Sequence, residues 1–323
     1  MAVESRQFVR ADLGDLLALI SANAKCRWPR MTHLHPGDVA WQFPGAAPKD
    51  NIRLWFRGNS LVGYAWFQPP EAIRFDVDQH DDDAHAIREE MLRWAASRRW
   101  EFDPNFPFYI ELKSMQEWAE RILHPRVDSA HQTRYLVTSA FDSDADEIAF
   151  LAENDFRPTE HFEPFLTRSL DVIPDLPAPA GVCVRHVEAT DLAQRVEVHK
   201  AAWWPSTGFT LERYLQVRGF TAAFDPELDL VAEAVDGSFA CCCIGWTDTE
   251  SKIAFIEPFG THPDWRGKGV SSAVIYEFFR RARAKGMHHV RIYTAGFNHQ
   301  AIRLYESCGL KLIDRSRTYL KAL

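Results

Sequence analysis

EPFGTHPDWRGKGVSS, residues 257–272, is the stretch that decides the fold. It reads as a strand, a short turn, a glycine-bearing loop and the first turn of a helix. Gly267 and Gly269 leave out side chains where a ligand must approach backbone N–H groups closely. The helix that follows would add unpaired N–H donors and the positive end of its dipole, and Arg266 and Lys268 add cationic charge. These features indicate a pyrophosphate site, although alone they also fit an ordinary strand-to-helix turn.

The segments downstream of the loop supply a second pattern. Apolar residues recur at helical spacing over residues 270–284, and residues 289–294 alternate like a strand. Asn298 then opens a second helix, which Gly309 closes, and residues 310–323 supply a final strand. The loop and the second helix are therefore separated by one helix and one strand.

Taken together, these motifs resemble the GNAT superfamily of acetyl-CoA-dependent N-acetyltransferases. The family's pyrophosphate loop, Arg/Gln-x-x-Gly-x-Gly/Ala, appears as RGKGVS at residues 266–271, with a serine as the final small residue. Its second signature, Asn-x-x-Ala-x-x-Leu-Tyr-Glu-x-x-Gly, matches residues 298–309. The resemblance implies acetyl-CoA as co-substrate and no metal. The cofactor-binding residues that it assigns are Phe259, Gly260, Thr261, Arg266, Gly267, Lys268, Gly269, Val270, Ser271, Ser272, Asn298 and Tyr305.

Tyr305 and Glu257 are the candidate catalytic residues. The resemblance aligns Tyr305 with the tyrosine that protonates the CoA sulfur, whereas periodicity alone makes it a core aromatic residue of an amphipathic helix. Glu257 lies two residues before Phe259 and next to a proline that distorts strand pairing. A carboxylate there could bind a cationic amine and take its proton, and the alternative is an edge-strand glutamate in water. His262 and His199 are weaker candidates for the base.

Three further expectations concern the surroundings of the reacting groups. The resemblance places the pantetheine arm alongside residues 259–261, where backbone N–H groups would pair with it and stabilise an oxyanion. Asn298 has two compatible roles, as a helix N-cap and as a hydrogen-bond partner of the cofactor arm. Residues 203–209, WWPSTGF, are expected to line the acceptor side, because exposed aromatic loops tend to bind ligands.

Composition limits the class of protein. The chain has 323 residues, 46% of them hydrophobic, which suits two packed domains. We see no stretch apolar enough to span a bilayer, no secretory signal and no C-x-x-C spacing among the six cysteines. We therefore expect a cytoplasmic protein with reduced thiols and no membrane partner. The net charge of −8 argues against a nucleic-acid partner.

The predicted fold is α/β, with two tandem GNAT-like domains, each a mixed, mostly antiparallel sheet flanked by helices. Residues 171–181 form a Pro-rich linker, and residues 182–323 form the catalytic GNAT domain. Residues 1–170 repeat the same order of elements, but HDDDAH at residues 80–85 stands where the glycine loop should be. Because carboxylates there would repel a pyrophosphate, we predict a degenerate domain without a pyrophosphate loop.

Charge is divided unevenly between the halves. Residues 181–323 hold 18 Lys and Arg against 16 Asp and Glu, which leaves 19 against 29 for residues 1–180. The acidic half has two expected uses, as a scaffold or as one wall of the acceptor cleft that concentrates a cationic amine. Residues 27–48 are predicted to form a long loop, and residues 100–131 an insertion.

The predicted function is N-acetyl transfer from acetyl-CoA to a primary amine of a small molecule by direct attack. Acetylation of a protein or peptide amine and a non-catalytic acetyl-CoA-binding sensor are the alternatives. No G-x-S-x-G signature indicates a covalent enzyme intermediate, and Cys308 has no evident base beside it. A monomer and a homodimer both fit.

Overall fold

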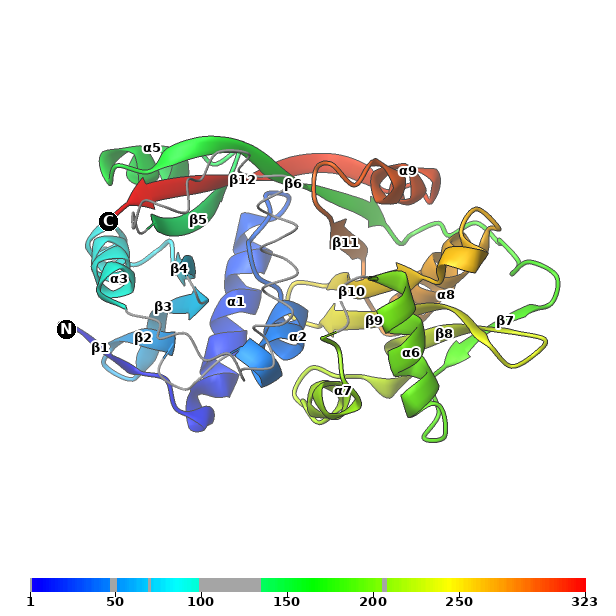
Figure 1. Ribbon diagram of the computed structural model, residues 1–323. Helices are drawn as coiled ribbons and strands as arrows, with labels where there is room; N and C mark the ends of the chain where they lie inside the picture. The colour runs from blue at the N-terminus through cyan, green and yellow to red at the C-terminus, as the bar shows by residue number, and fades with distance from the viewer. Residues whose placement is uncertain (1, 47–50, 69–70, 99–134, 205–207) are drawn as a thin grey trace, which may run out of the picture.

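Strands from both halves of the chain join into one twelve-stranded sheet (Figure 1). The computed structural model describes residues 2–46, 51–68, 71–98, 135–204 and 208–323, so the predicted insertion at residues 100–131 lies outside the described residues. The strands are β1 (Val3–Gln7), β2 (Ile52–Arg57), β3 (Ser60–Gln68), β4 (Ala72–Val77), β5 (Tyr135–Phe141), β6 (Arg157–Ser169), β7 (Val182–His186), β8 (Asp229–Ala234), β9 (Phe239–Asp248), β10 (Ile253–Thr261), β11 (His289–Tyr293) and β12 (Lys311–Ala322). The helices are α1 (Leu13–Arg27), α2 (Pro36–Ala46), α3 (Ala84–Ser97), α5 (Ala145–Glu153), α6 (Leu192–Ala202), α7 (Leu211–Arg218), α8 (Val270–Ala284) and α9 (His299–Ser307), with 3-10 turns at Arg10–Asp12, Pro226–Leu228 and Pro263–Trp265.

Two strands at the centre of the sheet are exchanged between the halves. The order is β1-β2-β3-β4-β5-β12-β6-β11-β10-β9-β8-β7. β6, the last strand of the first half, pairs with β11, while β12, the last strand of the chain, lies between β5 and β6. Figure 1 shows β6 in green and β12 in red running side by side from one half to the other. Each half therefore completes its sheet with a strand of the other half, which the sequence did not predict.

The predicted fold class is confirmed by the pairing within the sheet. β4–β5 and β10–β11 are parallel, and the other pairs are antiparallel. The helix predicted over residues 270–284 is α8, and the helix predicted after Asn298 is α9. Asn298 caps α9, because its side-chain oxygen accepts a hydrogen bond from the N–H of Ala301 at 3.2 Å. Gly309 follows with a φ of +82°, which favours glycine.

Helices cover both faces of the sheet. On one face, Val274 and Phe278 of α8 belong to the same apolar core as Ile256 of β10. On the other face, Phe255 of β10 belongs to a core that also contains residues of α1, α2 and α7, such as Val39. This second core crosses from one half of the chain to the other, so the halves share apolar burial as well as strands.

The prediction of a long loop over residues 27–48 is wrong for its second part, which forms α2. The helix lies against the second half, where the buried Asp38 carboxylate accepts hydrogen bonds from Arg291 Nη2 at 2.8 Å and Tyr293 Oη at 2.9 Å. These bonds offset the desolvation of the buried pair. Gly37 and Pro44 lower the intrinsic helix propensity of this segment, and tertiary contacts override it.

The six cysteines are all free thiols, and four of them are buried. Cys241, Cys242 and Cys243 lie in β9, and burial raises the pKa of each. None of the described helices combines the length and the apolar character needed to cross a membrane. Within the described residues, no group of His, Cys, Asp and Glu is arranged to hold a metal ion.

Candidate active site

The loop between β10 and α8 has the geometry of an anion site. Gly267 and Gly269 have φ values of +72° and +79°, a conformation that side chains with a Cβ rarely adopt. Residues 266–269 are exposed. Gly269 is the N-cap of the 15-residue α8 and provides no side-chain cap, so the first N–H groups of that helix stay available to a ligand.

Hydrogen bonds from Arg266 and Thr261 hold the loop in place. Arg266 Nε donates to the carbonyl oxygen of Thr261 at 3.3 Å, and its Nη2 donates to the carbonyl oxygen of Ala202 at the end of α6 at 3.0 Å. The Thr261 hydroxyl lies 2.8 Å from the hydroxyl of Ser271 in the first turn of α8. The predicted cofactor residues that the structure gathers around this loop are Thr261, Arg266, Gly267, Lys268, Gly269, Val270, Ser271 and Ser272.

β10 is paired on one side only at its C-terminal end. Its pairing with β11 ends at Phe255 opposite Arg291, whereas its pairing with β9 resumes at Phe259 after a register shift. The shift falls at residues 257–258, where the sequence predicts that a proline distorts the strand. Among the described strands, none pairs with residues 257–261 on the β11 side. This edge is where an extended cofactor arm could add as a further strand.

Tyr305 belongs to the apolar core that α8 forms with β10. Its ring meets that of Phe259 edge-on, with the centroids 6.5 Å apart, and the residue is only 5% exposed. Burial, followed by the charge of Glu257, raises the pKa of Tyr305 above its ordinary value. The Tyr305 ring packs as a core aromatic residue, with its hydroxyl on the helix that follows the Asn298 cap.

Glu257 is half-buried at the register shift of β10. Its backbone oxygen accepts a hydrogen bond from Trp246 Nε1 at 2.5 Å, which anchors the distorted part of β10 to β9. Burial and the carboxylates of Asp38, Glu257 and Glu163 raise the pKa of Tyr293. Glu257 therefore lies within electrostatic reach of two phenols, Tyr293 and Tyr305. Tyr293 and Glu163 carry no sequence signal beyond their position in alternating strands.

Both candidate histidines have structural roles. His199 stacks between Trp203 and Phe209, with centroid distances of 4.2 Å and 4.0 Å. Burial and, after it, the charge of Arg195 lower the pKa of His199 well below its ordinary value, so the ring is neutral. His262 Nδ1 accepts a hydrogen bond from the N–H of Asp264 at 3.3 Å and caps a short turn.

The predicted acceptor-side segment is partly packed and partly exposed. A Cβ on Gly260 would lie 2.1 Å from the ring of Trp203, so glycine at this position of β10 lets α6 close on the strand. Trp204 is 76% exposed, whereas Phe209 is buried. Residues 205–207 lie outside the described residues.

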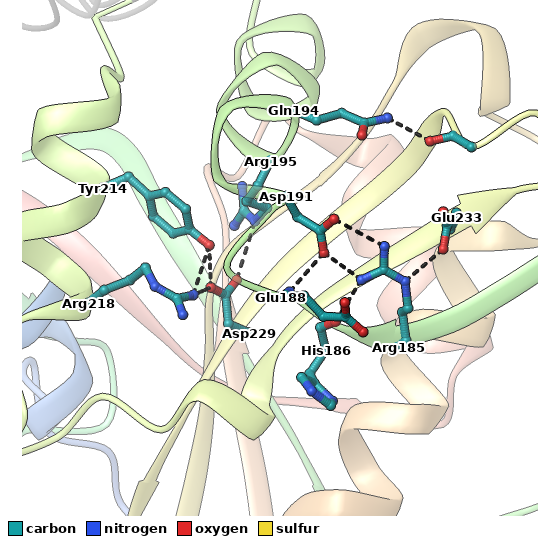
Figure 2. Close-up of polar contacts among 11 residues, drawn as sticks. Arg185, His186, Glu188, Asp191, Gln194, Arg195, Tyr214, Arg218, Asp229 and Glu233 are labelled. Atoms are coloured by element: carbon teal, nitrogen blue, oxygen red, sulfur yellow. Dashed lines mark hydrogen bonds and ion pairs between the residues drawn. The ribbon is translucent and has the colours of Figure 1, made fainter.

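The helices α6 and α7 are anchored by the buried Asp229 of β8 (Figure 2). Its carboxylate accepts hydrogen bonds from Arg195 Nε of α6 at 3.3 Å, from Arg218 Nη1 of α7 at 2.7 Å and from the Tyr214 hydroxyl. Because Arg195 and Asp229 lie far in sequence from Tyr214 and Arg218, no local pattern indicated the cluster. These bonds hold α6 and α7 in place against the sheet.

The first half has a different arrangement at the equivalent place. A cavity of about 210 Å³ lies where β4 and β5, paired only at Ala72 and Val137, diverge. Ion pairs line it, with 2.6 Å between Arg27 Nη2 and Asp76 Oδ1 and 2.7 Å between Arg88 Nη2 and Glu147 Oε2. In the preceding loop, Arg57 Nη2 lies 2.6 Å from Asp81 Oδ1 and 2.7 Å from Asp83 Oδ2. Acidic groups therefore occupy the place of a glycine loop.

Glu147 gives this half a pH-dependent stability. Burial raises the pKa of Glu147 from 4.5 to about 7, against the attraction of Arg88. Between these values the unfolded chain releases the proton and the folded chain keeps it, so stability falls as pH rises through this window. The full effect corresponds to about 3 kcal/mol. We expect Glu147→Gln to lose this dependence, so that its unfolding free energy relative to wild type increases from pH 4 to pH 8.

Denaturant unfolding at several pH values measures this difference. Glu153→Gln, at the exposed end of the same helix, is the matched control and should differ from wild type by a constant amount. A difference between Glu147→Gln and wild type that does not change with pH would contradict the burial argument.

Comparison with known proteins relates part of the sequence to one family. Residues 195–310 match the Acetyltransferase (GNAT) family. A mycothiol acetyltransferase from Nocardiopsis dassonvillei is 34% identical over 119 residues, 34% of this chain and 35% of that protein, so the match spans about a third of the relative's length.

Two solved structures match almost the whole chain. A GCN5-related N-acetyltransferase from Sphaerobacter thermophilus has a TM-score of 0.62 at 18% identity, covering 99% of this chain and 95% of that one. A tandem GNAT protein from the clavulanic acid biosynthesis pathway has a TM-score of 0.61 at 14% identity, covering 99% and 98%. At these sequence identities, the structural similarity establishes the fold alone. That fold consists of two GNAT-like units in tandem.

Proposed function

We propose, from the match of residues 195–310 to the Acetyltransferase (GNAT) family, that the chain transfers acetyl from acetyl-CoA to a primary amine of a small molecule. One observation carries the proposal. The exposed loop with two left-handed glycines opens α8 beside the one-sided edge of β10. Such a pair of features suits a ligand that combines a pyrophosphate with an extended amide-bearing arm.

In the proposed reaction the amine attacks the thioester carbonyl directly. Glu257 binds the cationic amine and accepts its proton, directly or through water. The nitrogen lone pair forms the new C–N bond, and backbone N–H groups of residues 259–261 stabilise the oxyanion. The C–S bond then breaks, and Tyr305 gives its proton to the leaving thiolate. The second proton of the attacking nitrogen passes through water to the Tyr305 phenolate, which leaves an amide, the CoA thiol and a neutral phenol. Acetyl-CoA supplies the activated acyl group, and no metal or covalent enzyme intermediate is required.

The division of labour between the halves follows from the same proposal. Residues 182–323 provide the catalytic domain, and residues 171–181 are the linker, which forms neither helix nor strand. Residues 1–170 bind no acetyl-CoA, because ion-paired carboxylates stand in place of the glycine loop. We propose a cytoplasmic enzyme, a monomer or homodimer, whose partner is the amine rather than nucleic acid or a membrane.

Gly269→Asp is expected to abolish acetyl-CoA binding, with affinity at least ~100-fold weaker than wild type. A side chain at a φ of +79° strains the loop, and its charge repels the pyrophosphate. Calorimetry measures the affinity and should give one site per wild-type chain. Gly286→Asp is the matched control, because Gly286 has a φ of +83° at the other end of α8. Two sites per chain, or unchanged binding by Gly269→Asp, would overturn the assignment.

Release of CoA thiol in the presence of an amine panel tests the activity itself. We expect release with small primary amines by wild type and none by Gly269→Asp. Release only with peptide amines would replace the small-molecule acceptor by a protein or peptide. Binding of acetyl-CoA without release by any amine would favour a sensor.

A further inference from the structure

Three strands bring two carboxylates to one face of the sheet beside the proposed reaction site. In β10, Glu257 follows Phe255 by two residues, so the two side chains lie on the same face. In β6, Glu163 precedes Phe165 by two residues in the same way. Tyr293, the last residue of β11, stacks on both Phe255 and Phe165, with centroid distances of 5.5 Å and 4.7 Å. The two glutamates therefore flank Tyr293 from the strands on either side of β11.

The position of Glu163 depends on the strand exchange. β6 belongs to the first half, yet it pairs with β11 from Phe165 opposite Tyr293 to Ser169 opposite His289. Glu163 lies two residues past the end of this pairing, about 7 Å along the strand. There the N–H of Gly296 donates to the carbonyl oxygen of Phe162 at 2.9 Å, which holds the chain after β11 against β6. The first half thus contributes a carboxylate at the point where β10 and β11 diverge.

Glu163 has no bonding partner among the residues that the structure describes. It is partly buried, but no described donor forms a hydrogen bond or an ion pair with its carboxylate. Burial raises the pKa of Glu163, and the charge of Arg74 opposes this effect. Arg74 Nη1 instead donates to the Ser139 hydroxyl at 2.5 Å. The unpaired and partly exposed carboxylate of Glu163 is therefore available to accept a hydrogen bond from a ligand group.

The other acidic groups on this face are already satisfied or otherwise assigned. Asp38 accepts hydrogen bonds from Arg291, Tyr293 and the N–H of His35. Glu257 is the proposed partner of the reacting amine. Glu163 is therefore the carboxylate on this face that the proposed reaction does not use.

We propose that Glu163 is a specificity residue that binds a second hydrogen-bond donor of the acceptor, while Glu257 holds the amine that is acetylated. The inference rests on the proposed function and narrows its substrate class to amines that carry a hydroxyl or a second ammonium group. A donor in this position would replace the water that a half-buried carboxylate otherwise holds. The acceptor site would then be built from both halves, which explains why the first half is retained without a cofactor loop.

A matched series of acceptors tests the proposal. Amino alcohols, diamines and alkylamines with equal numbers of heavy atoms differ only in their terminal group, which is OH, NH₃⁺ or CH₃. We expect kcat/KM of wild type to favour a donor-bearing acceptor over the alkylamine by ~10- to 100-fold, the range of a hydrogen bond to a charged group. Scanning chains of about three to six carbons locates the optimal separation of the two groups.

Variants assign the preference to Glu163. Glu163→Leu should remove it and leave kcat/KM for the alkylamine unchanged within about threefold, since the alkylamine makes no bond there. Glu163→Gln keeps an acceptor oxygen but no charge, so a hydroxyl preference should persist in part and an ammonium preference should disappear. Glu160→Leu, at an exposed position of the same strand, is the control and should behave as wild type.

The outcomes separate this inference from the proposed function. Equal kcat/KM values of wild type for the three classes, or an equal loss for all three in Glu163→Gln, would overturn the role of Glu163 and leave the acetyltransferase intact. No CoA release by wild type with any amine, despite binding of acetyl-CoA, would overturn both. If Glu163→Leu fails to fold by thermal melting, the isosteric Glu163→Gln decides the question.

Discussion

Replacement of Tyr305 by phenylalanine is expected to lower kcat by ~10²–10⁴, the usual contribution of a general acid, with little change in acetyl-CoA affinity. The hydroxyl is the only group removed, and the ring contact with Phe259 is kept. Because the thiolate would then leave without a proton donor, the loss should appear in the chemical step. Single-turnover kinetics with a competent amine, together with calorimetry of acetyl-CoA, measure the two quantities separately.

Tyr276→Phe is the matched control for this experiment. Tyr276 lies in α8, belongs to the same apolar core as Tyr305 and is similarly buried, at 8% exposed. Loss of its hydroxyl should leave kcat unchanged. An unaltered kcat in Tyr305→Phe would make Tyr305 a packing residue only. A lower melting temperature with a proportional loss of cofactor binding would lead to the same conclusion.

Residues 182–323, produced without the first half, are expected not to form a monomeric domain that binds acetyl-CoA. Without β6, the outer edge of β11 is unpaired, and β12 loses both of its neighbours. Exposed strand edges promote aggregation. Arg291 would also lose Asp38, and breaking a buried ion pair from one side typically costs about 3–5 kcal/mol. Size-exclusion chromatography and calorimetry of the fragment measure both effects.

Co-production of residues 1–181 with residues 182–323 is the control for that prediction. The break then falls next to the linker, and every strand keeps its partners, so the complex should bind acetyl-CoA with the affinity of the intact chain. A monomeric fragment 182–323 with full affinity would mean that β12 can close on β11 by itself. The exchanged strands would then be dispensable for the cofactor site.

The sequence alone determined the elements that carry the cofactor site. These elements depend on local requirements: glycines for left-handed φ, apolar residues at helical spacing, and an Asn N-cap. Local requirements of this kind can be recognised in the sequence itself. For this reason the predicted helix over residues 270–284 coincides with α8. The absence of a glycine loop in the first half was visible in the same way, as a run of acidic residues at 80–85.

Only the tertiary structure decided which strands lie side by side. Alternation identifies β6 and β12 as strands, but it does not name their partners, and the two are equivalent strands of a duplicated pattern. The sequence did not predict α2 for the same reason, because this helix depends on contacts with the second half rather than on intrinsic propensity. Glu163 shows the consequence, because this residue of the first half lies two residues beyond the segment of β6 that pairs with β11 of the second half. Long-range strand pairing determines the position of Glu163, since hydrogen bonds between strands depend on the assembled sheet and not on neighbours in the chain.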